Sequence, residues 1–287
     1  MHPFNYYAPE TINEATEILK KYGDRARCLA GGTDVLVQAR GEKFELDAIV
    51  DVKKIPQLTK LEWTDSHLII GAATPCHVLY EDSKVCDLFP GIVDSAFLIG
   101  GIQIQSRASL GGNLCNASPS ADAICSLIVH ETTCEIAGPN GTREIPVEDM
   151  CTGPGKNALE NGEFLVSLKI PLKKGEISAS YERFIPRNEM DIAVAAVASS
   201  LELSNGKVSS CRVALAAVGP TPIFAKEASE LLVGKEPTDE NIKKVSEKAK
   251  DIASPIADMR GTVEHRKDLI EVLTRRTISK ALERAGG

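Results

Sequence analysis

The sequence predicts an α+β protein, for three reasons. Residues 54–173 contain short apolar runs bounded by glycine and proline, which is typical of strands joined by turns. Towards the C-terminus, a predicted β-hairpin is followed by a block of helical patterns instead of alternating with them. No G-x-G-x-x-G fingerprint opens a helix after a strand, which argues against a Rossmann domain.

The N-terminal residues 4–52 are expected to form a small α/β unit. Its helix begins with a capping box, Thr11-x-x-Glu14, ahead of an apolar stripe. A strand then runs into Gly31-Gly32-Thr33-Asp34, where glycines let main-chain N–H groups approach an anion. The expected elements are a helix over 11–23, strands over 27–30 and 48–52, and a helical pattern that resumes at Val35.

The middle of the chain is predicted to be a sheet with a few helices. The dipeptide Asn140-Gly141 between two apolar runs is a strong hairpin signal. The expected elements are strands over 68–72, 133–137, 142–145 and 164–170, helices around 78–79 and 90–98, and a loop over 153–156.

A second glycine-rich stretch, SRASLGGNLCNASPSAD, covers Ser106–Asp122. Gly111-Gly112 lacks Cβ atoms, so consecutive N–H groups can converge on an oxyanion. Ser118-Pro119 has the form of an N-cap and first helical residue, and a helix start beside glycines favours phosphate. A lone Gly-Gly is more often an ordinary turn, but two such stretches suit a pyrophosphate held from two sides.

A charged segment, Lys173-Lys174-Gly175-Glu176, marks the predicted domain boundary. The first domain is expected over residues 1–175, in parts 1–53 and 54–175, and the second over 176–287. In the second, strands 193–203 and 208–217 flank a hairpin turn at Asn205-Gly206. Helices are expected over 223–233, 239–252 and 262–278.

Composition narrows the class of partner and compartment. The net charge of −7 argues against nucleic acid or an anionic membrane surface. No apolar run is long enough for a membrane span and the N-terminal residues do not resemble a signal peptide, so we expect a cytoplasmic protein. The eight cysteines are scattered without a C-x-x-C pair, so no metal site is expected.

Taken together, the motifs resemble the FAD-binding medium subunit of the molybdenum hydroxylases, the family of xanthine dehydrogenase and molybdenum carbon monoxide dehydrogenase. They follow one another in order over nearly the whole chain. The resemblance implies a two-subdomain FAD-binding fold of the vanillyl-alcohol-oxidase (PCMH) type, followed by an α+β C-terminal domain with an antiparallel sheet and helices. The matching motifs are Ala30–Asp34, Ser109–Asn113 with Asn116-Ala117-Ser118-Pro119-x-x-Asp122, Thr152–Lys156, Asp191-Ile192-Ala193 and Asp258-x-Arg260-Gly261.

The resemblance also implies a set of cofactor-binding residues, and it implies no catalytic residue and no metal ligand. One side of the pyrophosphate and ribityl chain would be lined by Arg27, Cys28, Leu29, Ala30, Gly31, Gly32, Thr33, Asp34 and Val35. The other side would be lined by Ser109, Gly111, Gly112, Asn113, Cys115, Asn116, Ser118 and Asp122, with Cys115 a packing residue and not a redox thiol. Ile99, Gly100 and Leu165 would contact the flavin, and Arg183 would be a cation near the isoalloxazine.

The function that the resemblance implies is electron transfer. Non-covalent FAD would take electrons from two-iron two-sulfur clusters of a small subunit and pass them to an acceptor such as NAD, a quinone or ferredoxin. A large subunit with molybdopterin would hydroxylate the substrate. A self-contained FAD oxidoreductase with its own small substrate is one alternative, and a scaffold that has lost FAD is another.

The chain departs from the family pattern at three positions. Gln105 and Ala108 stand where an arginine and a glycine are common, and Arg183 stands where lysine is frequent. From residue type alone, Arg183 would be a solvated cation on a strand edge, Asp122 a first-turn acid of a helix and Tyr181 a packing residue.

Overall fold

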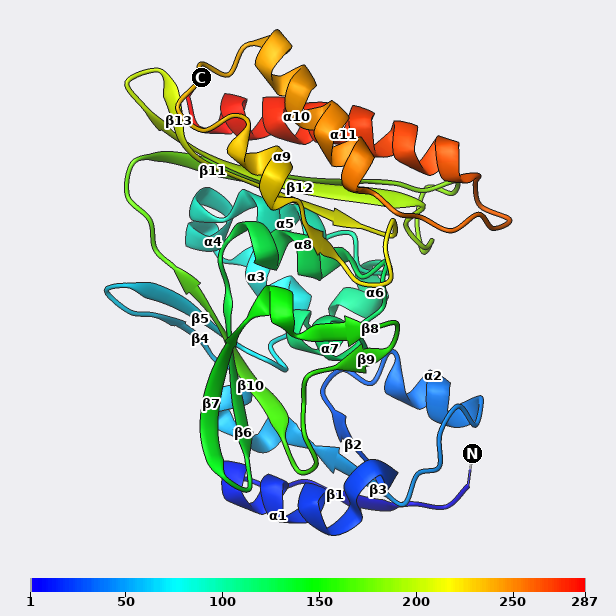
Figure 1. Cartoon of the computed structure of the whole chain (residues 1–287). Coiled ribbons are helices and arrows are strands. Elements are labelled where there is room, and N and C mark those ends of the chain that lie inside the picture. The colour runs from blue at the N-terminus through cyan, green and yellow to red at the C-terminus, as the bar shows by residue number, and fades with distance from the viewer. Residues whose placement is uncertain (1, 287) are drawn as a thin grey trace.

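The computed structural model describes residues 2–286 and confirms the α+β class. Three units follow one another along the molecule (Figure 1). The N-terminal unit lies at one end, a larger sheet with short helices lies in the middle, and the C-terminal sheet with its long helices lies at the other end. Within residues 2–286, no helix is long and apolar enough to cross a membrane.

The N-terminal unit is a parallel sheet in the order β1-β3-β2, with α1 packed on it. The predicted capping box is present, because Thr11 Oγ1 accepts the Glu14 N–H at 3.2 Å. Ala15 and Leu19 of α1 pack with Val50 in a small core. The elements, with 3₁₀ helices labelled η, are β1 (Asn5–Tyr7), α1 (Ile12–Tyr22), η1 (Gly23–Arg25), β2 (Ala26–Leu29), α2 (Val35–Arg40), β3 (Ala48–Asp51), η2 (Val52–Lys54) and η3 (Pro56–Leu58).

The middle unit is an antiparallel sheet in the order β4-β5-β10-β6-β7. The predicted β6–β7 hairpin is present, with Pro139-Asn140 as its turn and Gly141 as the first residue of β7. Short helices separate this sheet from the C-terminal one (Figure 1). Among them, α8 is buried along its whole length. The elements are β4 (Leu61–Trp63), β5 (His67–Gly71), α3 (Cys76–Glu81), α4 (Ser83–Leu88), α5 (Pro90–Ala96), α6 (Ile102–Gln105), α7 (Leu110–Asn116), α8 (Asp122–Val129), β6 (Thr133–Gly138), β7 (Gly141–Pro146), η4 (Val147–Asp149), β8 (Cys151–Gly153), β9 (Lys156–Asn157) and β10 (Phe164–Pro171).

The C-terminal sheet is antiparallel, in the order β11-β12-β13-β14, and is buried on both faces. Side chains alternate between the faces along β12. Ala196 and Ala198 join the core of the middle unit, whereas Ala195 and Val197 join a second core with α10 and α11. The elements are β11 (Glu176–Phe184), β12 (Ala195–Ser204), β13 (Lys207–Ala216), β14 (Ile223–Phe224), α9 (Lys226–Glu230), α10 (Asp239–Ile252) and α11 (Val263–Arg284).

The glycine pair lies inside a helix, and not in the ordinary turn that was the alternative to a ligand-binding stretch. Ser109 is the N-cap of α7, and its Oγ accepts the Gly112 N–H at 3.0 Å. The helix ends at Asn116 because Ala117 takes a left-handed φ of 49°. The predicted N-cap at Ser118-Pro119 is also wrong. Those residues form a turn, closed by the Ala121 N–H on Ser118 O at 3.0 Å, and α8 begins after it.

One further expectation was wrong. The predicted helix over 223–233 begins instead as a strand, because Ile223 and Phe224 pair with Leu215 and Ala214 on β13. Only the short α9 follows. The expected loop over 153–156 is the turn of a small hairpin, β8–β9. At β14, pairing with the preceding strand β13 overrides the apolar pattern that predicted a helix.

Candidate functional site

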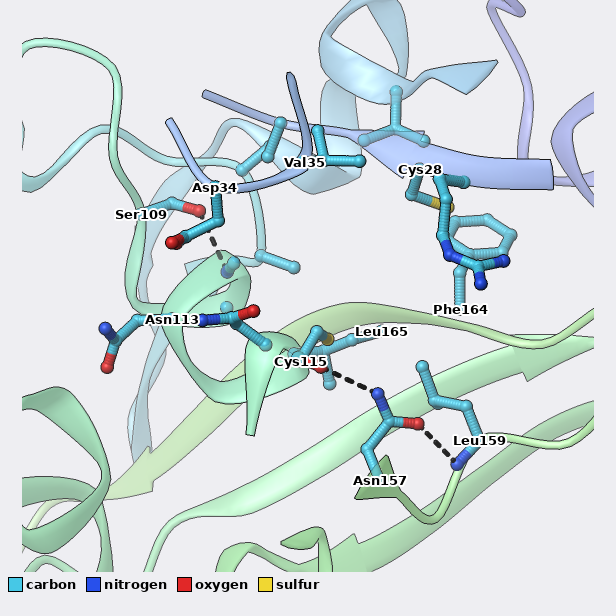
Figure 2. Close-up of a pocket in the computed structure, with 18 of the residues that line it drawn as sticks. Cys28, Asp34, Val35, Ser109, Asn113, Cys115, Asn157, Leu159, Phe164 and Leu165 are labelled. Atoms are coloured by element: carbon cyan, nitrogen blue, oxygen red, sulfur yellow. Dashed lines mark hydrogen bonds between the residues drawn. The ribbon is translucent and has the colours of Figure 1, made fainter. Parts of the chain in front are cut away.

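A cavity of about 750 Å³ lies between the N-terminal and middle units. Its size is within the range of small-molecule and cofactor sites. Figure 2 shows Cys28, Asp34 and Val35 on the N-terminal side, opposite Asn113 and Cys115 on α7. The two glycine-rich stretches singled out in the sequence therefore face one cavity.

Close backbone approach explains why glycine stands at two positions of the wall. A Cβ on Gly31 would lie 2.0 Å from Arg107 O, so only glycine lets the Ala30–Asp34 loop pack against the other glycine-rich stretch. A Cβ on Gly111 would lie 2.4 Å from Ala72 O. Gly111 thus allows α7 to pack on the chain after β5. This packing role was not part of the prediction, which considered only the approach of its N–H group to an anion.

Amide side chains tie the two sides of the cavity together. Gln38 on α2 donates to Asn116 Oδ1 on α7 at 2.8 Å, and Asn157 donates to Cys115 O at 2.7 Å. Asn113 Oδ1 accepts the Ala123 N–H at 3.1 Å and so joins α7 to α8. Of these three bonds, the one between Gln38 and Asn116 joins the N-terminal unit to the middle unit, and the other two lie within the middle unit.

Most of the residues predicted to bind a cofactor line this cavity. They are Arg27, Cys28, Ala30, Gly31, Gly32, Thr33, Asp34, Val35, Ile99, Ser109, Gly111, Gly112, Asn113, Cys115, Asn116 and Leu165. Leu29, Gly100, Ser118, Asp122 and Arg183 are not among the lining residues. The sequence interpretation missed other wall residues, among them Gln38, Lys43, Phe44, Asn157, Leu159 and Phe164. Only Asn157 had a signal, because it directly follows the motif Thr152–Lys156.

Two cysteine thiols, those of Cys28 and Cys115, lie in the cavity wall and have raised pKa values. Burial raises the pKa of Cys28 to about 12 and raises the pKa of Cys115 further. A thiol is nucleophilic only as the thiolate, and a raised pKa disfavours the thiolate near neutral pH. The packing role of Cys115 stays a prediction.

A buried charge cluster lies at the start of α8. Asp122 Oδ1 accepts the Tyr181 hydroxyl and Oδ2 accepts Arg183 Nη1, each at 2.7 Å. The Arg183 side chain is only 4% exposed, so the expectation of a solvated cation was wrong. Burial raises the pKa of Asp122, while the Arg183 charge and both hydrogen bonds oppose that rise. Tyr181 is a hydrogen-bonding member of this cluster as well as a packing residue.

Comparison with known proteins assigns the fold to a family. The model of the FAD binding domain in molybdopterin dehydrogenase matches residues 2–173, and that of the CO dehydrogenase flavoprotein C-terminal domain matches residues 180–281. The chain is 32% identical to the xanthine dehydrogenase FAD-binding subunit of Escherichia coli O157:H7, over 99% of this chain and 97% of that protein. It is 31% identical to the carbon monoxide dehydrogenase medium chain of Afipia carboxidovorans, over 98% of each.

A solved structure agrees with these matches. A chain of reconstituted CO dehydrogenase from Oligotropha carboxidovorans superimposes with a TM-score of 0.95 at 30% identity, over 99% of both chains. The chain belongs to the molybdopterin dehydrogenase flavoprotein family. It is an FAD-binding oxidoreductase subunit of the xanthine dehydrogenase type.

The structure shows where Gln105 and Ala108, two residues at which this flavoprotein departs from the family pattern, lie and what they contact. Gln105, where arginine is common, is buried at 3% exposure; its amide donates to Phe97 O at 2.7 Å and accepts the Tyr80 hydroxyl at 3.1 Å. It therefore fixes α6 to α3 and places no charge near the cavity. Ala108 is buried and lines the cavity, next to the point where Gly31 packs closely.

Proposed function

We propose that this flavoprotein is the FAD-carrying electron-transfer subunit of a molybdenum hydroxylase complex. Bound FAD would supply the redox chemistry that links two-iron two-sulfur clusters of a small subunit to an external acceptor such as NAD, a quinone or ferredoxin. The observation that carries the proposal is the single cavity faced by both glycine-rich stretches, which suits a dinucleotide held from two sides. The molybdopterin and the substrate would belong to a large subunit.

The residues around the cavity fit FAD. The segment Arg27–Val35 and the start of α7 at Ser109–Asn113 would hold the pyrophosphate and ribityl chain. Ile99 and Leu165 add apolar surface for the flavin ring. We include Leu29, Gly100, Cys115, Asn116 and Ser118 in the same proposed site.

The charge cluster of Asp122 and Arg183, neither of which lines the cavity, is proposed to act on the isoalloxazine through its electrostatic field. Its buried guanidinium would favour negative charge on the reduced flavin, since electrostatic interactions are stronger away from water. The negative charge of Asp122 offsets part of the positive field of the Arg183 guanidinium. The contact between the two side chains therefore sets how much positive potential reaches the flavin.

The domain division is proposed as predicted, with an FAD-binding domain over 1–175, in parts 1–53 and 54–175, and a C-terminal domain over 176–287. The family matches at 2–173 and 180–281 and the start of β11 at Glu176 support it. The cytoplasmic location remains a prediction.

Three measurements on the purified full-length chain test the proposed function. We expect one FAD per chain, no oxidation of small organic substrates by the isolated chain, and co-purification of iron–sulfur and molybdopterin subunits from the native host. Substrate oxidation by the chain alone would favour a self-contained oxidoreductase. Absence of a yellow chromophore after FAD is added would contradict the cofactor assignment.

A further inference from the structure

Two cations hold the carbonyl groups of the Ala30–Asp34 loop. Lys53 Nζ donates to Ala30 O at 2.9 Å, and Arg107 Nε donates to Gly31 O at 3.2 Å. Neither Lys53 nor Arg107 lines the cavity, whereas Ala30 and Gly31 do. The two cations therefore reach the loop from behind its cavity side.

Holding these carbonyls fixes the direction of the next N–H groups. In a trans peptide the C=O and the following N–H point in opposite directions, and no cis peptide occurs within the described residues. Anchoring Ala30 O and Gly31 O thus turns the N–H groups of Gly31 and Gly32 away from the cations. Within residues 2–286, neither N–H group has a protein acceptor. Both remain as donors for a bound anion.

Lys53 is itself held in place from two strands. Asp51 Oδ1, on β3, accepts Lys53 Nζ at 2.7 Å, and Asp51 Oδ2 accepts the Tyr6 hydroxyl of β1 at 2.6 Å. Asp51 is 9% exposed, so these charge-assisted bonds are partly shielded from water. A lysine on a flexible stem is thereby fixed in one position behind the loop.

We propose that Lys53 is a positioning residue for the pyrophosphate of the dinucleotide, a role that rests on the proposed function. It holds the Ala30–Gly31 peptide with its N–H towards the cavity. The ammonium also polarises that peptide, and a polarised peptide is a stronger N–H donor. Lys53 thus acts on the phosphates through a backbone group without touching them.

The test compares Lys53→Met with Lys54→Met in the full-length apo chain. Lys54 is the adjacent, exposed lysine of the same 3₁₀ helix, so it controls for the loss of one positive charge. The probes are ADP and FAD, which carry the pyrophosphate, and riboflavin, which carries no phosphate. We expect Lys53→Met to weaken ADP and FAD binding by roughly 10- to 100-fold, the usual range for losing a hydrogen bond to a charged group. Riboflavin binding should not change, Lys54→Met should bind like the wild type, and Lys53→Arg should restore most of the affinity.

Several outcomes would overturn the role of Lys53. One is ADP binding by Lys53→Met as tight as by Lys54→Met. Another is a loss of riboflavin affinity equal to the loss of ADP affinity, which would indicate a general structural defect. Should Lys53→Met fail to fold, Tyr6→Phe leaves the lysine in place and loosens only Asp51. It should weaken ADP binding several-fold, and unchanged binding would count against the proposal. If the wild-type chain binds neither FAD nor ADP, it is the proposed function that fails.

Discussion

Replacing Arg183 with methionine should destabilise the protein strongly, because it removes the cation from a buried ion pair. The side chains of Arg183 and Asp122 are 4% and 10% exposed and lie in contact at 2.7 Å. Once the guanidinium is gone, the Tyr181 hydroxyl is the one side-chain partner left to Asp122 within residues 2–286. Breaking such a pair from one side costs about 3–5 kcal/mol. Arg187→Met is the matched control, since the Arg187 side chain is 70% exposed and its pair with Asp191 should be worth less than about 1 kcal/mol.

The assay is urea unfolding of the FAD-free chain at pH 8 and again at pH 5.5, followed by the fluorescence of Trp63. Burial already raises the pKa of Asp122, and losing Arg183 removes the largest opposing influence. An acid whose folded pKa lies above its unfolded pKa binds protons on folding, so the variant should regain stability relative to wild type as the pH falls. Asp122→Asn combined with Arg183→Met should recover part of the loss at pH 8. A deficit below 1 kcal/mol, or one equal at both pH values, would refute the reasoning.

Three other predictions concern the cavity. Arg183→Ala should make the flavin reduction potential more negative, and an unchanged or higher potential in a redox titration of the FAD-loaded chain would contradict the proposed field of the guanidinium. Gly111→Ala should lower the free energy of unfolding by roughly 2–3 kcal/mol through overpacking, because its Cβ would meet the Ala72 backbone. Gly112→Ala, whose Cβ would lie 3.1 Å from Ser109 Oγ, should cost clearly less in the same urea titration, and equal losses would show that the close approach to Ala72 does not matter. Cys28 and Cys115 should remain unlabelled by iodoacetamide at pH 8 in the native chain and react once it is unfolded; rapid native labelling, read by mass spectrometry, would rule out their raised pKa values.

Local sequence signals predicted the elements that are fixed by their own residues. The capping box at Thr11 and the hairpin signal at Asn140-Gly141 each act within a few residues, and both features are present. The spacing of apolar residues within the helix likewise predicted the bounds of α10, Asp239–Ile252. A signal of this kind was wrong where strand pairing competes with it, as when the preceding strand β13 draws Ile223 and Phe224 into β14.

The sequence by itself identified both glycine-rich stretches and, through the motif resemblance, the family and its FAD. Tertiary structure decided what each stretch does locally. It placed Gly111 in a helix packed on Ala72, and it buried Arg183 against Asp122. It also put Lys53 behind the Ala30 carbonyl, although no motif includes that lysine. The physical reason is that caps and turns depend on neighbours in the chain, whereas burial, ion pairing and the direction of a peptide group depend on residues that only folding brings together.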